Sequence, residues 1–270
     1  MTPQHFFDLF EKELANSPQL TKYYKIINSP RSYAFRKAYF MQRLEFIYRS
    51  IQNKNLNVWD VGCGYGTTAI FLALNGIKVH GSTLEFYFKE IEKRLAWWKQ
   101  HGDVSKFTYG YENIFDTSIS DHTFDVIILQ DTLHHLEPIN EAITILSNTL
   151  KPNGKLIISE VNGKNLFERL KYFKQRGNKK VIKIYDENLK KEIWFGNENI
   201  RSIETWNVEL SKAQLEINNQ SLEYIRMIPP PLMNTKNYSK IIKKEQEIWK
   251  KNNFLKKYFF FGINFIAEKK

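Results

Sequence analysis

Two spacings of hydrophobic residues divide the chain. Up to about residue 57 they recur every three or four positions, and Phe40, Leu44, Ile47 and Ile51 line one face of a helix that Pro30 opens. From residue 58 onward, short apolar runs alternate with helical stretches. This change predicts a helical segment over 1–57, followed by an α/β core with parallel strands and helices on both faces.

Strands are expected where the apolar runs lie, at 57–61, 78–82, 107–109, 126–130 and 155–159. Helices are expected between them, at 67–75, 85–101 and 141–150. Lys151-Pro152-Asn153-Gly154 is predicted to be the turn that ends the last of these helices and precedes a buried strand. These elements define a core over 58–160.

After residue 160 the alternation loosens. A helix at 165–175 and two short strands within 181–195 indicate a cap insertion over 161–202. Residues 203–270 are expected to complete the core with a helix at 203–215 and strands at 222–227 and 259–267. Three prolines then introduce a basic insertion over 229–256, which carries a lysine-rich helix at 238–251.

The first strand ends in a glycine-rich loop, Asp60-Val61-Gly62-Cys63-Gly64-Tyr65-Gly66, ahead of a helix that begins near Thr67. Glycines let the backbone turn tightly and approach a ligand, and a helix start offers free N–H groups. A dinucleotide-binding loop would need its third glycine at position 67, where Thr67 stands, and no Gly-Lys-Ser/Thr follows. An ordinary strand-to-helix turn is the alternative to a ligand site.

Five motifs in this order resemble those of the class I S-adenosylmethionine-dependent methyltransferases: the loop at 60–66 and the segments 78–85, 124–127, 133–136 and 150–156. The resemblance implies an α/β fold of three layers, with a Rossmann-like, mostly parallel seven-stranded sheet, N-terminal helices and late cap insertions. It also implies S-adenosylmethionine as the cofactor, held at its methionine end by Asp60, the loop residues Gly62, Cys63, Gly64 and Gly66, and Gln130.

The resemblance extends to the other end of the cofactor with two departures. The acidic residue usual after the second strand is replaced by Thr83, so Thr83 or Glu85 is expected at the ribose, unless Glu85 only starts a helix. After the third strand, Tyr111, Glu112 and Asn113 stand where the family often has Gly-Asp-Ala, and they are expected at the adenine. Solvated loop residues are the alternative.

His134 and His135 follow the fourth strand, at the sheet edge where α/β proteins bind ligands. Histidine can accept a proton near neutral pH, so either is a candidate catalytic base. The alternative is that one caps a helix and the other packs beneath the loop. Glu160, at the end of the fifth strand, is expected to face either the substrate or a surface turn. No metal ligands are predicted.

The chain holds 40 Lys+Arg against 29 Asp+Glu, a formal charge of +11. Residues 1–160 hold 17 of each kind, whereas residues 161–270 hold 23 basic and 12 acidic residues. Aromatic side chains are interspersed among the late lysines, a pattern that suits an apolar substrate attached to an acidic carrier protein, or an anionic membrane surface. Stacking and charge would also suit RNA. A merely solvated surface is the alternative.

The predicted function is therefore methyl transfer to an O, N or C atom of a small or lipid-like molecule, free or bound to a carrier. RNA or protein methylation through the basic half, and a catalytically inactive binding protein, are the alternatives. No Asn-Pro-Pro-Tyr follows the fourth strand, which argues against base-flipping amino-methyltransferases. The single Cys63 and an acidic, non-signal N-terminal segment favour a cytoplasmic protein, free or at the surface of a membrane.

Overall fold

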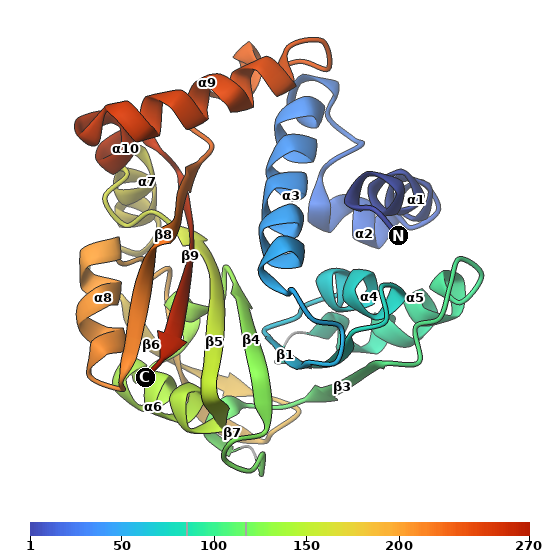
Figure 1. Ribbon diagram of the computed structural model, residues 1–270, viewed down its shortest axis with the longest axis vertical. Coiled ribbons are helices and arrows are strands. Elements are labelled where there is room, and N and C mark those ends of the chain that lie inside the picture. Colours follow the sequence, from blue (N-terminus) through green and yellow to red (C-terminus); the bar gives the residue numbers. More distant parts are fainter. Residues whose placement is uncertain (85, 117) are drawn as a thin grey trace.

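The computed structural model describes residues 1–84, 86–116 and 118–270, and a seven-stranded sheet forms its centre (Figure 1). The strand order is β3-β2-β1-β4-β5-β9-β8. Neighbours from β3 to β5 are parallel, and β9 is antiparallel to both β5 and β8. The strands are β1 (Asn57–Val61), β2 (Lys78–Thr83), β3 (Phe107–Tyr111), β4 (Phe124–Gln130), β5 (Leu150–Val161), β8 (Leu215–Ile225) and β9 (Gly262–Lys269).

Alternation along the central strands builds a hydrophobic core on each face of the sheet. In β1, Val58 packs with one core, and Trp59 and Val61 pack with the other. Helices α4 (Thr67–Leu74) and α5 (Ile91–Trp98) cover the first face, while α6 (Ile139–Thr149) and α8 (Ile203–Ser211) cover the second. The predicted three-layer, mostly parallel α/β fold is thereby confirmed.

The N-terminal helices α1 (Pro3–Ala15), α2 (Pro18–Tyr24) and α3 (Pro30–Ser50) belong to the first core. Phe6 of α1 stacks on Trp98 of α5, with ring centroids 4.5 Å apart. Glu13 of α1 forms a buried ion pair with Arg94, whose guanidinium also donates to Tyr65 O and Thr67 Oγ1. The N-terminal segment thus packs directly against the junction between the glycine loop and α4.

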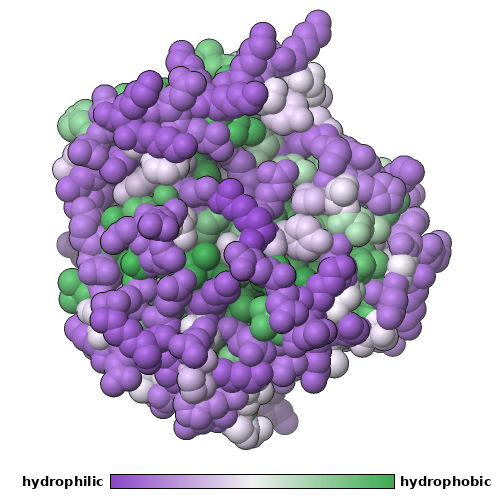
Figure 2. Space-filling view, in the orientation of Figure 1, coloured by the Kyte–Doolittle hydropathy of each residue, from purple (hydrophilic) through white to green (hydrophobic). Residues whose placement is uncertain are grey.

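The insertion over 229–256 lies beyond the carboxyl end of β8 (Figure 1). Residues 161–202 contain α7 (Leu166–Arg176) and a hairpin of β6 (Val181–Asp186) and β7 (Lys191–Gly196). The lysine-rich helix is α9 (Tyr238–Lys251), and α10 (Asn253–Phe259) leads into β9. Viewed in this orientation the face is mostly hydrophilic, with hydrophobic residues across its middle (Figure 2). No helix in the described ranges is long and apolar enough to cross a membrane.

Several predicted elements are wrong in extent, among them the strand expected at 222–227, which runs from Leu215 to Ile225. The turn predicted at 151–154 lies inside β5, because Phe124 of β4 already pairs with Leu150 through a register shift. The helix predicted to reach residue 215 ends at Ser211, since Gln214 has a φ of 61°, and β8 begins at Leu215. Of the predicted helix 85–101, the described part divides into a 3₁₀ turn, Phe86–Glu90, and α5.

Candidate active site

A cavity of about 670 Å³ lies over the carboxyl ends of the parallel strands. Its wall is formed by α2 and α3, the loops after β1, β2, β3 and β4, the 161–202 insertion, and Arg226 after β8. This is the edge at which open α/β sheets bind ligands. The wall includes these residues that the sequence singled out: Gly62, Cys63, Gly64, Thr83, Glu112, Asn113, Gln130, His134 and His135.

The glycine loop needs its glycines for two physical reasons. Gly62, Gly64 and Gly66 have φ values of 72°, 55° and 70°, a region that side chains with a Cβ rarely adopt. A Cβ on Gly62 would also lie 2.3 Å from Oγ1 of Thr132. The loop is fixed to β2, because the N–H groups of Gly62 and Cys63 both donate to Ser82 O. It therefore presents a rigid strip of backbone to the cavity.

Replacing Gly62 with alanine should weaken cofactor binding by more than tenfold and destabilise the fold, because the new Cβ collides with Thr132 and the positive φ costs about 1–2 kcal/mol. Calorimetry with S-adenosylmethionine and thermal unfolding would measure the two effects. Gly177→Ala is the matched control, since Gly177 has a φ of 59° but nothing within 4 Å of its Cβ position. Equal losses of cofactor affinity in both variants would contradict the close fit at Gly62.

Asp60 offers the clearest test of whether the loop suits the cofactor. Its side chain is buried next to the carboxyl end of β1 and is not on the described cavity wall, and its Oδ2 has no hydrogen-bond partner among the described residues. Burial raises the pKa of Asp60 to about 7, although Arg43 opposes the shift. An unpaired buried carboxylate oxygen favours a nearby cation, and the methionine end of S-adenosylmethionine carries an ammonium group. The residues present therefore fit this cofactor.

Two more predicted residues lie beside the loop. Gln130, at the end of β4, donates from Nε2 to Thr68 Oγ1 at 2.7 Å and so joins β4 to the first turn of α4. Cys63 faces the cavity as a protonated thiol, because burial raises its pKa. Gly66 is the N-cap of α4 and is absent from the described cavity wall. The structure thus places Gly62, Cys63, Gly64 and Gln130 together.

At the opposite end of the cavity, Thr83 is buried at the end of β2, and Glu85 lies outside the described residues. Glu112 lies on the wall 2.9 Å from His80 Nε2, and Asn113 Oδ1 accepts from the N–H of Phe115. Tyr111 is not on the wall. Its hydroxyl instead lies 2.9 Å from Leu84 O and 2.7 Å from Oδ2 of Asp186 in the insertion.

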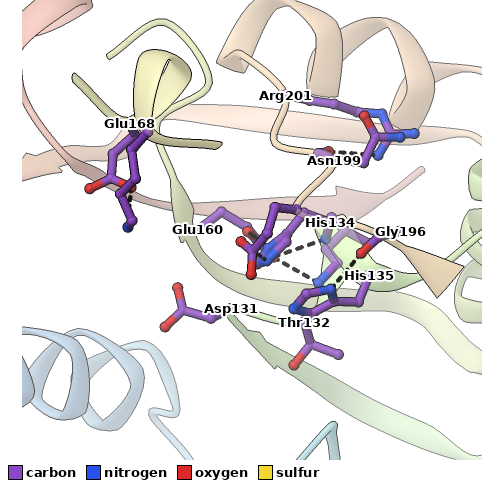
Figure 3. A network of polar contacts seen from close by, with 12 residues as sticks. Asp131, Thr132, His134, His135, Glu160, Glu168, Gly196, Asn199 and Arg201 are labelled. Atoms are coloured by element: carbon purple, nitrogen blue, oxygen red, sulfur yellow. Dashed lines mark hydrogen bonds and ion pairs between the residues drawn. The ribbon is translucent and has the colours of Figure 1, made fainter. Parts of the chain in front are cut away.

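The two adjacent histidines occupy different electrostatic environments (Figure 3). His134 is buried, with Nδ1 2.6 Å from Glu160 Oε2 and Nε2 3.7 Å from Glu198 Oε2. Burial alone would lower the pKa of His134, but the charge and hydrogen bond of Glu160, with Asp131 and Glu198, raise it to about 9. His134 is therefore an imidazolium at neutral pH and has no lone pair with which to accept a proton.

His135 is the histidine that can act as a base. Its Nδ1 lies 2.7 Å from the carbonyl oxygen of Gly196, which can only accept, so Nδ1 carries the proton and Nε2 keeps a lone pair. Burial and the positive charge of His134 lower the pKa of His135. Its ring stacks on Phe195 at 4.6 Å, which fixes its orientation in the cavity wall. His135 is thus neutral at pH 7.

The contact between His135 and the insertion depends on Gly196. A Cβ at this position would lie 2.1 Å from the carbonyl oxygen of His134 and 3.0 Å from Cα of His135. Leu136 also forms a bridge with Phe195. The end of β7 therefore lies directly against the histidine segment.

His134, His135 and Glu198 place three potential metal-ligand atoms within 4.8 Å of one another. Such a set can hold a transition-metal ion. However, Nδ1 and Nε2 of His134 each already face a carboxylate, and a metal ion at Nε2 would have to displace the proton that those carboxylates stabilise. The contacts of His134 therefore suit a bound proton.

Several wall residues were not expected from the sequence. Arg36, Tyr39 and Arg43 of α3 face the cavity, and Arg43 pairs with Asp131 at 2.6 Å. Their i, i+3, i+7 spacing on α3 was the available signal for a shared polar face. Glu160 lies neither on a surface turn nor on the described cavity wall: it is buried and accepts from the N–H of Leu133 as well as from His134.

Comparisons with known proteins agree with this geometry. A sequence model described as "Methyltransferase domain" matches residues 59–158. The Rickettsia conorii protein named ubiquinone biosynthesis O-methyltransferase is 34% identical over 118 residues, which cover 44% of this chain and 39% of that protein. The chain spans less than half the length of that curated relative, and about half of others that it matches.

Solved structures show the same fold at low identity. A putative sarcosine dimethylglycine methyltransferase from Galdieria sulphuraria superposes with a TM-score of 0.59 and 13% identity, covering 87% of this chain and 88% of that one. Phosphoethanolamine N-methyltransferase 2 of Haemonchus contortus, in complex with S-adenosyl-L-methionine, superposes with a TM-score of 0.55 and 19% identity, covering 85% and 52%. The ordered motifs, the sheet and the domain match together show a class I S-adenosylmethionine-dependent methyltransferase domain over residues 59–158, with S-adenosylmethionine as the cofactor.

Proposed function

We propose that the protein transfers the methyl group of S-adenosylmethionine to a hydroxyl oxygen of a small aromatic molecule. The observation that carries this proposal is His135, a neutral histidine on the cavity wall whose protonated nitrogen is bound by a backbone carbonyl. An oxygen nucleophile must lose its proton as it attacks, whereas an already neutral amine needs no base before attack. A fixed neutral base therefore favours oxygen over nitrogen.

The cofactor, when bound, supplies an electrophilic methyl group on a sulfonium. In the proposed mechanism, Nε2 of His135 accepts the proton of the substrate hydroxyl, and the Gly196 carbonyl stabilises the imidazolium that results. His134 keeps His135 neutral beforehand, because its own positive charge disfavours a second cation beside it. The insertion 161–202 covers the sheet edge beside His135 and excludes water. Positioning of the substrate then supplies much of the rest of the rate enhancement.

The shape and lining of the cavity support a small aromatic substrate. A volume of about 670 Å³ falls in the range typical of small-molecule sites. Beyond the glycine loop the wall is rich in rings, which suit flat apolar groups: Tyr23, Tyr24, Phe35, Tyr39, Phe40, Tyr172, Trp194 and Phe195. The relatives from Rickettsia carry the name ubiquinone biosynthesis O-methyltransferase, which agrees with an oxygen acceptor.

Incubation with ¹³C-methyl-labelled S-adenosylmethionine and a panel of phenols, catechols, amines and RNA tests the proposal. We expect label on a phenolic oxygen, located by NMR of the product. Label found only on nitrogen, on carbon or on RNA would contradict it. Calorimetry should first show binding of the cofactor, since a protein that binds none at millimolar concentration would be no methyltransferase.

The basic segment 229–256 has a different position from the one expected for a substrate-facing insertion. None of its residues is on the cavity wall in the described parts of the chain, and the lysines of α9 are exposed on the outer surface. Docking of an acidic carrier protein, an anionic membrane or RNA on this helix stays a prediction. If such docking occurs, the rate of substrate turnover should fall steeply as salt is added.

A further inference from the structure

Two arginines on the cavity wall lack an ionic partner. Among the described residues, neither Arg36 nor Arg226 lies within 4.0 Å of a carboxylate oxygen, and the Nε–H of each is buried without a hydrogen-bond acceptor. The other charged groups on the wall are paired. The pairs are Arg43 with Asp131, Lys171 with Glu168, Glu112 with His80, and His134 with Glu160 and Glu198.

Aromatic rings hold the guanidinium group of Arg226 in place. Cζ of Arg226 lies over the ring of Tyr39, 3.9 Å from its centroid, and 5.5 Å from the ring centroid of Phe35. Arg36 makes one weak hydrogen bond, to Tyr24 O at 3.5 Å. Burial and the neighbouring charge of Arg226 lower the pKa of Arg36, so the two cations share one electrostatic environment. Stacking leaves the edges of a guanidinium open to an anion.

Their places in the fold separate them from the cofactor. Arg43, on the same helix, already reaches Asp131 at the end of β4, and Arg36 lies two helical turns, about 10 Å, farther from the strand ends. Arg226 follows β8, the fourth strand from β1, so its backbone is about 19 Å across the sheet from the glycine loop. The ribose and adenine candidates lie after β2 and β3, on the other side of that loop.

We propose that Arg36 and Arg226 bind an anionic group, a carboxylate or a phosphate-type group, on the methyl-accepting molecule. This inference rests on the proposed function, because it assigns a second recognition element to the same substrate. Two arginines facing one space recognise oxyanions through paired charge-assisted hydrogen bonds. The substrate would be held at its anion by the arginines and presented at its hydroxyl to His135.

Three matched probes test this proposal: 3,4-dihydroxybenzoate, 3,4-dihydroxyphenylphosphonate and the neutral 3,4-dihydroxybenzamide. Binding of each is measured by calorimetry to the protein loaded with S-adenosylhomocysteine, and methyl transfer is measured separately. Arg36→Gln and Arg226→Gln should each lower the affinity for an anionic probe by about 10- to 100-fold. Both variants should keep the affinities for the neutral amide and for S-adenosylmethionine within about twofold of the wild-type values. The anion whose binding depends more strongly on the arginines identifies the group recognised.

Arg31→Gln, at the exposed start of α3, is the control and should change none of these affinities. Arg226→Lys keeps the charge and serves if the glutamine variant unfolds; it should retain part of the preference for the anion. Equal weakening of all three probes, loss of S-adenosylmethionine affinity by the same factor, or anionic probes that bind no better than the amide would each overturn the proposal. Arginine-dependent binding without methylation of any probe would support the anion site and count against the proposed hydroxyl chemistry.

Discussion

Replacing His135 with glutamine should lower kcat by about 10²- to 10⁴-fold, the usual contribution of a general base. Glutamine can still donate to the Gly196 carbonyl, but it has no basic nitrogen for the substrate proton. S-adenosylmethionine affinity should change little, because His135 is not part of the glycine loop. Steady-state kinetics with the accepted phenol, together with calorimetry of the cofactor, would separate the two effects.

The dependence of kcat/KM on pH should show the same base. His135 must be neutral to act, and its pKa is lowered, so kcat/KM in the wild-type protein should be level at pH 7 and fall only at acid pH below about 6.5. The glutamine variant should lose that acid limb. His122→Gln is the matched control, since His122 Nδ1 also binds a carbonyl, Leu150 O at 3.0 Å, but lies outside the cavity wall. A variant of His135 that keeps most of kcat would rule out the base role.

Replacing Glu160 with glutamine should destabilise the fold by about 3–5 kcal/mol, because it leaves the buried imidazolium of His134 without its nearest anion. The glutamine also loses one carboxylate oxygen of the two that serve His134 and the N–H of Leu133. Urea unfolding at neutral pH would measure the loss. Glu204→Gln, which removes a half-exposed partner of Lys164 and Lys257, should cost at most about 1 kcal/mol.

The ion pair of His134 with Glu160 makes the free energy of unfolding depend on pH in a defined direction. The pKa of His134 is about 9 in the folded protein and near 6.5 when unfolded, so the folded state holds its proton more tightly. The stabilisation is complete below pH 6.5 and is lost as the pH rises through 9, a total of roughly 3 kcal/mol. The free energy of unfolding should fall over this window in the wild-type protein. In the Glu160→Gln variant the free energy of unfolding should fall much less over this pH window. An unchanged dependence on pH would mean that other titrating groups cause the fall.

The sequence was sufficient for the order and faces of the core elements, because strand and helix periods differ and each buried strand is strongly apolar. Val58 and Trp59 show this, since consecutive residues enter opposite cores. The errors lie where local signals and tertiary pairing compete. Lys151-Pro152-Asn153-Gly154 has turn composition, but pairing of Leu150 with Phe124 extends the strand through it. Periodicity alone could not reveal that pairing.

The residues of the site were predictable from the sequence only where they form a motif within one short segment. The glycine loop and the two histidines are local motifs, and the structure brings most of them to one cavity. The roles within that cavity depend on distant residues. Glu160 lies 26 positions from His134 and Gly196 lies 61 positions from His135, yet these partners decide which histidine is charged. Arg226 likewise reaches the wall only through the antiparallel pairing of β8 with β9.

The close approach of Gly196 to the histidine segment limits how this enzyme can be re-engineered. Exchanging the β6–β7 hairpin for that of another methyltransferase is an attractive way to change substrate preference, because the hairpin supplies Trp194 and Phe195 to the aromatic wall. A donor hairpin with any side chain at position 196 would push the segment away from His134 and withdraw the carbonyl from His135. Grafts at this site should therefore keep one glycine fixed while every ring around it is varied.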